Sequence, residues 1–125
     1  MNQDVLTTIQ TVYHNFNHAF LNEVLVGPRR EVTLIVSPLV WHGSQGKYEA
    51  AIAIRFGGVQ DFRDVAIQFQ KLSSLESEIG FLGPDPDSMG GKVGVHHFKF
   101  VSERRDFEFT FRCSNVRIEN AKARH

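Results

Sequence analysis

Residues 92–113 read KVGVHHFKFVSERRDFEFTFRC and contain two runs in which hydrophobic and polar side chains alternate. The runs cover 92–101 and 107–113, and the charged segment 103–106 separates them. Successive side chains of a β-strand point to opposite faces, so alternation with a period of two is typical of half-buried strands. This part of the sequence therefore predicts a β-hairpin.

A turn centred on the two arginines fixes the register of this hairpin. The opposed pairs are then Phe98 with Phe111, Phe100 with Phe109, His97 with Arg112, Lys99 with Thr110, and Val101 with Glu108. One face carries the phenylalanine rings, and the other is largely polar. A shift by one residue would mix the two faces, so the hydrophobic pattern specifies this register. The same register places His96 opposite Cys113 on the phenylalanine face.

The first 20 residues have the periodicity of an amphipathic helix. Their hydrophobic residues recur at steps of three and four, at Val5, Leu6, Ile9, Val12, Tyr13, Phe16 and Phe20. At roughly 100° per residue these positions form one stripe along a helix. We therefore expect an N-terminal helix that packs this stripe against the rest of the protein.

Further strands are predicted in four segments rich in β-branched and hydrophobic residues. These segments are 20–26, 31–37, 48–56 and 115–120. Gly27-Pro28-Arg29-Arg30 between the first two is a typical turn, and residues 83–91 have the composition of a loop. Residues 61–79 fit both a helix and a strand; we favour a strand followed by irregular chain, although the period alone does not arbitrate.

Length and composition indicate a single domain that covers residues 1–125. The chain has 42% hydrophobic and 22% charged residues, which are ordinary values for a folded protein. The connections between the predicted strands are too short for crossover helices, and this favours antiparallel pairing. We expect an α+β fold in which the N-terminal helix packs on a mainly antiparallel β-sheet of about six strands that can curl around a core.

Charge and cysteine content exclude several functional classes. Fourteen Lys and Arg residues balance fourteen Asp and Glu residues, so no net positive charge would attract nucleic acid or an anionic membrane. A single cysteine cannot form an internal disulfide. The N-terminal residues lack the hydrophobic run of a signal peptide, and no segment has the ~20 hydrophobic residues of a membrane-spanning helix. We expect a cytoplasmic protein without nucleic-acid or membrane partners.

The aromatic residues are skewed toward phenylalanine, with eleven Phe against one Trp and two Tyr. One interpretation is a pocket for an apolar small molecule inside a curled sheet. The other is a core packed by cross-strand aromatic pairs. Phenylalanine has no polar group to orient a ligand, so we favour the core.

Two pairs of residues have the spacing of chemical sites. His96 and Cys113 fit a nucleophile with its base or half of a metal site, or else a buried thiol beside a histidine. No third group that would orient a catalytic pair can be assigned. His14 and His18 have the i, i+4 spacing of two metal ligands, but they lie opposite the apolar stripe, on a face expected to be exposed. We therefore predict no catalytic residue, no metal and no cofactor.

Trp41 and His42 precede a glycine-containing loop at residues 43–46. Tryptophan is enriched at the energetic centres of protein interfaces, so an exposed Trp41 would mark a binding edge. The candidate ligand-binding or partner-binding residues are therefore Trp41, His42, His96 and Cys113.

Residues 16–36 (FNHAFLNEVLVGPRREVTLIV) and 48–62 (YEAAIAIRFGGVQDF) resemble small, uncharacterised bacterial β-rich domains, some of which resemble immunity proteins of polymorphic toxin systems. The matching points are His18-Ala19, the turn at Gly27-Pro28, and Phe56-Gly57-Gly58-Val59. Ala19 stands where these domains have an acidic residue. The resemblance implies a binding protein without catalytic activity, and it assigns no site residue.

Three functional hypotheses follow. The first is a small interaction module without catalysis, with a protein partner and an immunity-protein-like role. The second is a curled sheet that binds a small apolar ligand in its phenylalanine-rich interior. The third is an enzyme or metal protein built around the candidate histidines and Cys113. Exposed strand edges also allow a homodimer.

Overall fold

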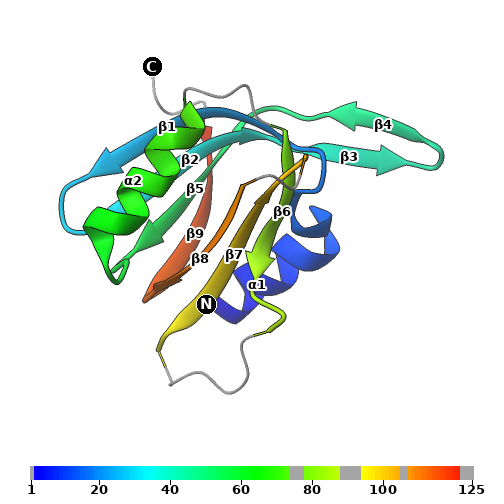
Figure 1. Ribbon diagram of the computed structural model, residues 1–125. Coiled ribbons are helices and arrows are strands. Elements are labelled where there is room, and N and C mark those ends of the chain that lie inside the picture. The colour runs from blue at the N-terminus through cyan, green and yellow to red at the C-terminus, as the bar shows by residue number, and fades with distance from the viewer. Residues whose placement is uncertain (1, 74–77, 88–93, 105–106, 122–125) are drawn as a thin grey trace.

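The computed structural model describes residues 2–73, 78–87, 94–104 and 107–121 (Figure 1). Within these residues the chain forms two α-helices, one short 3-10 helix and nine β-strands. In chain order the elements are α1 (Asn2–Thr11), η1 (His14–Phe16), β1 (Phe20–Gly27), β2 (Glu31–Ser37), β3 (Leu39–His42), β4 (Gln45–Tyr48), β5 (Ile52–Gly57), α2 (Phe62–Ser73), β6 (Ile79–Pro84), β7 (His96–Ser102), β8 (Glu108–Cys113) and β9 (Asn115–Asn120).

The strands form three antiparallel sheets, which confirms the α+β class. The first sheet has the order β1-β2-β5-β9, the second has the order β6-β7-β8, and β3 and β4 form a separate hairpin. The predicted single sheet of about six strands was wrong in this respect. Where one sheet ends and the next begins depends on where the chain leaves one set of paired strands and joins another. The alternation of side chains along a strand carries no information about this point.

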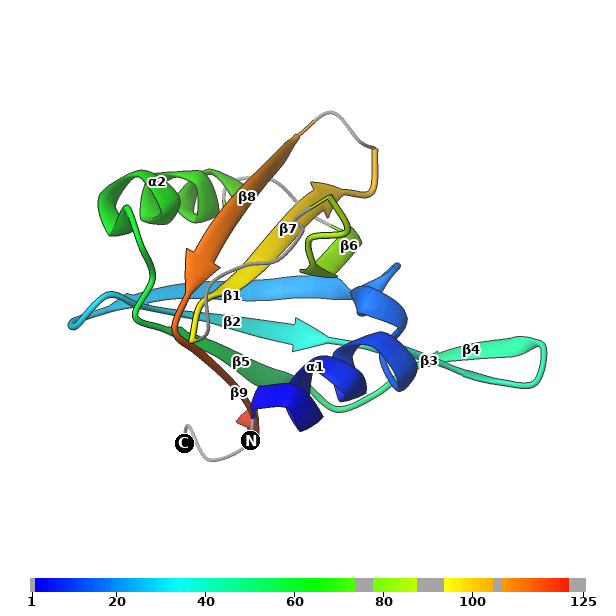
Figure 2. The same cartoon turned by 90° about the horizontal axis from the view of Figure 1, so that it is seen from below.

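The two larger sheets are joined at two corners. At one corner β8 continues through Ser114 directly into β9, and the Ser114 amide donates to the Gly57 carbonyl at 2.9 Å. At the other corner the start of β1 lies beside the start of β6, where the Ile79 amide donates to the Ala19 carbonyl at 2.8 Å. Figure 2 shows the two sheets set at an angle to each other, with α2 beside β1 and β8.

Phenylalanine rings fill the space between these sheets. Six phenylalanines are buried in one core cluster: Phe16, Phe56, Phe69, Phe98, Phe100 and Phe111. The Phe56 ring from β5 meets the Phe98 ring at a centroid distance of 5.2 Å and the Phe111 ring at 5.0 Å, both edge to face. Such contacts between the two sheets add to the energy of simple burial.

The predicted register of the C-terminal hairpin is confirmed. β7 and β8 pair His96 with Cys113, Phe98 with Phe111 and Phe100 with Phe109. The other three predicted pairs are also present: His97 with Arg112, Lys99 with Thr110, and Val101 with Glu108. Burial alternates from His97 to Phe100, where both phenylalanines are buried, and the alternation ends at Val101, which is also buried. Residues 92 and 93, the start of the predicted strand, lie outside the described residues, as do residues 88–91 of the predicted loop.

The predicted N-terminal helix ends earlier than its hydrophobic stripe suggested. α1 stops at Thr11, Val12 is exposed, and Phe20 belongs to β1. His14 and Phe16 have φ angles of +50° and +55°, which a right-handed helix does not allow. The chain turns sharply here, and this turn brings Phe16 into the core. Ile9 carries the buried face of α1, which lies against β6 and β9.

The strand favoured at the start of residues 61–79 was also wrong, because Phe62–Ser73 form α2. The helical positions Val65, Phe69 and Leu72 are buried, whereas Ile67 is 51% exposed. A strand with Val65 and Phe69 on its buried face would have buried Ile67 as well. The tertiary environment selects the helix, because only the helical face matches the phenylalanine cluster.

Two further boundaries differ from the prediction. The strand predicted at 48–56 begins at Ile52, because Gln45–Tyr48 pair with β3 instead. The predicted loop at 83–91 overlaps the last two residues of β6. None of the helices in the described part of the chain is both long and apolar enough to cross a membrane.

Candidate functional site

The β3–β4 hairpin projects away from both larger sheets (Figures 1 and 2). Its turn uses Gly43, whose φ of +68° is a conformation that glycine adopts without strain. Trp41 pairs with Gly46, and Leu39 pairs with Tyr48, so these four residues share one face. A Cβ atom on Gly46 would lie 3.3 Å from the Trp41 ring, so the indole lies close over the glycine backbone.

This hairpin exposes its aromatic side chains to solvent. Trp41 is 51% exposed and Tyr48 is 50% exposed, and both belong to the few large hydrophobic residues that the core leaves uncovered. The base of the hairpin is held in place, because the Tyr48 hydroxyl donates to the His18 carbonyl at 3.2 Å and the Glu49 amide donates to the Pro38 carbonyl at 2.9 Å. The backbone of His42 pairs with Gln45, and its side chain lies outside the described part of the structure.

His96 and Cys113 are opposite each other, as predicted, but Cys113 is buried. Burial raises the pKa of the Cys113 thiol from 9.0 to about 12. The thiolate is the nucleophilic and metal-binding form of cysteine, and this environment suppresses it. The geometry therefore favours the interpretation of Cys113 as a buried thiol that packs in the core.

We expect the native Cys113 thiol to react slowly with iodoacetamide at neutral pH and rapidly after unfolding. Because its pKa is raised in the folded state, the stability that it contributes is present below pH 9.0 and is lost as the pH rises toward about 12. Denaturant unfolding across this range should show a steeper loss of stability for the wild type than for Cys113→Ala. Equal alkylation rates in the native and unfolded chains would contradict the buried position.

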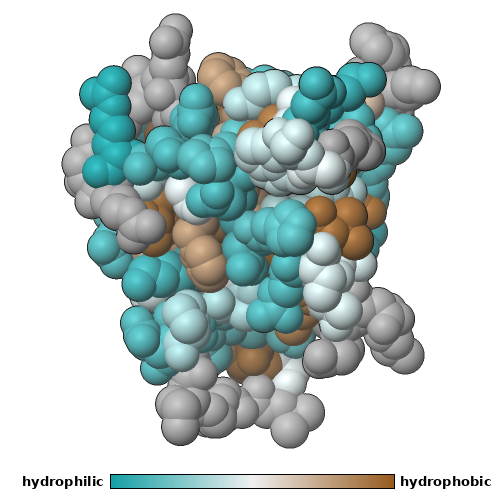
Figure 3. Space-filling view, turned by 90° about the vertical axis from the view of Figure 1, so that its right-hand side faces the viewer, coloured by the Kyte–Doolittle hydropathy of each residue, from teal (hydrophilic) through white to brown (hydrophobic). Residues whose placement is uncertain are grey.

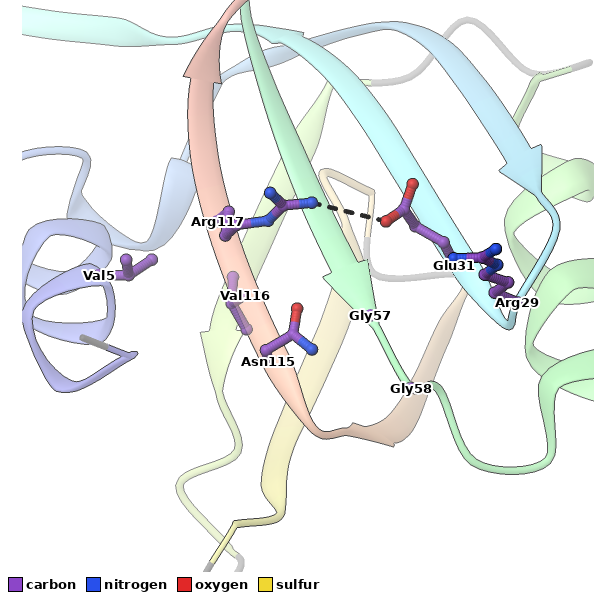
Figure 4. Close-up of a pocket in the computed structure, with 8 residues that line it drawn as sticks. All are labelled: Val5, Arg29, Glu31, Gly57, Gly58, Asn115, Val116 and Arg117. Atoms are coloured by element: carbon purple, nitrogen blue, oxygen red, sulfur yellow. Dashed lines mark ion pairs between the residues drawn. The ribbon is translucent and has the colours of Figure 1, made fainter.

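An open pocket of about 600 Å³ lies beside the first sheet (Figure 4). Arg117 of β9 points across it toward Glu31 of β2, with 3.7 Å between Nη2 and Oε2. Arg55 bonds Glu119 at 2.8 Å and also faces Glu31 at 3.6 Å. The hydrogen bond to Arg55 lowers the pKa of the Glu119 carboxyl. Glu31 and Arg117 of this pocket therefore belong to a network of ion pairs with Arg55 and Glu119, and Arg29 also lines the pocket.

A second group of chemically active side chains lies where β1, β6 and β7 meet. His18, Glu78 and Glu103 place one ligand atom each within 4.8 Å of one another. The prediction that His14 and His18 share one helix was wrong, because His18 follows η1 and has a φ of +64°. The two glutamates were missed, because they come from distant parts of the chain and no local spacing connects them.

Comparisons of the chain with protein-family models, with characterised proteins and with solved structures gave no match. The resemblance to immunity-protein-like domains therefore stays a prediction, and the arguments for function come from the geometry of this chain.

Proposed function

We propose that this protein is an interaction module without catalytic activity, which binds a partner protein through the aromatic face of the β3–β4 hairpin. The observation that carries the proposal is the exposure of Trp41 and Tyr48 on one face of a projecting arm. Leu39 extends this face toward the body of the protein. Tryptophan and tyrosine supply large contact areas at low cost in side-chain entropy, and they are enriched among residues that dominate binding energies.

The surroundings of the hairpin support this interpretation. Figure 3 shows the side of the molecule toward which the hairpin projects; most of its coloured surface is hydrophilic, and the hydrophobic areas are small and separate. An apolar centre surrounded by polar surface is the usual arrangement of a protein interface. We infer a partner with an apolar depression that accepts the indole of Trp41.

The alternative function, an apolar ligand within the phenylalanine interior, has less support. Phe69 alone has four neighbouring rings at centroid distances between 4.9 and 6.4 Å. Rings at these distances are in direct contact with one another, as in a packed core. The exposed aromatic side chains of the β3–β4 hairpin, by contrast, do not pack in the core. Binding of a partner protein would explain their exposure.

The test compares proteins retained from native lysate by the wild type, by Trp41→Ala and by Ile67→Ala. Ile67 is a matched control, because it has the same 51% exposure but lies on α2. A partner that Ile67→Ala retains and Trp41→Ala loses would support the proposal. With the purified partner, we expect Trp41→Ala to weaken binding by about 2 kcal/mol or more, roughly thirtyfold, as measured by calorimetry.

Trp41 is the single tryptophan of the chain, so its fluorescence reports directly on the hairpin. We expect the emission to shift to shorter wavelengths when the partner binds. Partners retained equally by the wild type and Trp41→Ala would contradict the proposal. A concentration-dependent dimer that Trp41→Ala abolishes would also contradict it, because the occupant of the hairpin would then be a second copy of the chain.

A further inference from the structure

Three side chains with metal-binding atoms converge at the corner where β1 and β6 meet. The Nδ1 atom of His18 lies 3.3 Å from Oε1 of Glu103 and 3.7 Å from Oε2 of Glu78. The three side chains are 36–46% exposed, so an ion from solvent can reach them. Each residue comes from a different segment: His18 precedes β1, Glu78 precedes β6, and Glu103 follows β7.

Backbone hydrogen bonds hold these three segments together. The His18 amide donates to the Ile79 carbonyl at 2.8 Å, and the Glu103 amide donates to the Glu78 carbonyl at 3.1 Å. Glu78 also forms an isolated β-bridge with Phe20. The Cα positions of the three residues are therefore set by the sheets, and only short side-chain movements separate them from a common ligand.

Two carboxylates and one imidazole face one another at this corner. In the described part of the chain, His18 is the ion-pair partner of both Glu78 and Glu103, and no lysine or arginine pairs with either carboxylate. The two carboxylates together can carry two negative charges. A divalent cation would neutralise both and would also accept the imidazole nitrogen as a ligand.

We propose that His18, Glu78 and Glu103 bind one zinc ion. Zinc binds histidine nitrogen and carboxylate oxygen at about 2.0–2.2 Å, and tetrahedral geometry then separates two ligand atoms by about 3.3 Å. The His18–Glu103 separation already has this value, and the His18–Glu78 separation exceeds it by a few tenths of an ångström. Three protein ligands leave the fourth zinc position for water or another ligand.

A bound ion would strengthen the junction from which the aromatic arm projects. The His18 carbonyl accepts the hydrogen bond from the Tyr48 hydroxyl, so the ligand residue is also part of the base of the hairpin. An ion that binds the folded chain and not the unfolded chain raises stability by mass action. None of the three proposed ligand residues belongs to the exposed aromatic face, so zinc binding can be tested separately from partner binding.

The experiment is a calorimetric titration of the full metal-free chain with zinc chloride. We expect one zinc ion per chain and a Tm that rises with zinc concentration. Glu103→Gln and Glu78→Gln each remove a charged ligand, from a partly exposed and an exposed position respectively. Removal of a ligand should weaken binding by at least about tenfold, since even supporting residues around metal sites have effects of this size.

His18→Asn completes the series, because asparagine tolerates the positive φ of this position better than most residues. The matched control is His14→Asn, at an exposed histidine that also has a positive φ, of +50°. Zinc affinity should be unchanged in the control, and zinc should raise its Tm as in the wild type. Absence of zinc binding in the wild type would overturn the proposal. Equal affinity in Glu103→Gln and the wild type would also overturn it, because the ion would then be bound elsewhere.

Discussion

Replacing Phe69 with alanine is expected to lower the free energy of unfolding by about 3–5 kcal/mol. Phe69 is fully buried and is the residue through which α2 reaches the rings of both larger sheets. Its ring neighbours are Phe56, Phe100, Phe109 and Phe111. Truncation removes these contacts and leaves a cavity that the four rings, held on the three strands β5, β7 and β8, cannot all move to fill.

Denaturant unfolding followed by circular dichroism measures this effect, and Ile67→Ala provides the control on the same helix. Ile67 is exposed, so its truncation should change the free energy of unfolding by no more than about 0.5 kcal/mol. The pair of variants also tests the helix itself. If residues 61–79 began with a strand, Ile67 and Phe69 would lie on one face, and both substitutions would have similar effects. Similar losses in the two variants would therefore contradict the position of α2.

The register of the β7–β8 hairpin could be predicted because its information is local, although the first strand begins at His96 and not at the predicted residue 92. Alternation across two adjacent runs specifies both the strands and their register, and a register error would expose several rings at once. The strands β1 and β2 could also be predicted, from their β-branched residues and the turn residues between them, but without a register. Short-range pairing of this kind requires no knowledge of the rest of the fold.

The elements that the sequence did not predict depend on distant contacts. Residues 65, 67 and 69 alternate as a strand would, and only the cluster between the sheets shows which of them must be buried. The end of α1 depends on a turn that brings Phe16 into the same cluster. Hydrophobic periodicity describes one face of an element, but it does not say where that element stops.

The candidate sites also include features that local sequence predicts and features that depend on distant contacts. Trp41 could be named from its type and its neighbouring glycines, but its exposure depends on β3 and β4 leaving the sheets together. His96 and Cys113 could be paired from the register, and the interpretation of Cys113 as a buried thiol agrees with its place in the core cluster, where burial raises its pKa. The group of His18, Glu78 and Glu103 had no sequence signal, because a sheet corner assembles it from three separate segments.

Gly80→Ala is expected to destabilise the protein at the corner where β1 and β6 meet. Gly80 is the extra residue of a bulge in β6, between Ile79, which pairs with Ser102, and Phe81, which pairs with Val101. A Cβ atom on Gly80 would lie 2.6 Å from the Ser102 carbonyl oxygen. This neighbour is backbone inside a paired strand, so it cannot rotate away as a side chain would. We expect a loss of about 1–3 kcal/mol in the free energy of unfolding, the usual cost of overpacking.

Gly27→Ala is the matched control for this substitution. Gly27 lies at the end of β1, and a Cβ atom there would have its nearest neighbour at 3.8 Å, an ordinary contact. Alanine also restricts the unfolded chain more than glycine does, so Gly27→Ala should be neutral or stabilising by up to about 1 kcal/mol. Thermal unfolding of the two variants separates the steric cost from the general effect of removing a glycine. If Gly80→Ala were as stable as Gly27→Ala, the close approach of β6 to β7 at this corner would be refuted. The backbone positions of Glu78 and Glu103, which depend on that approach, would then need revision as well.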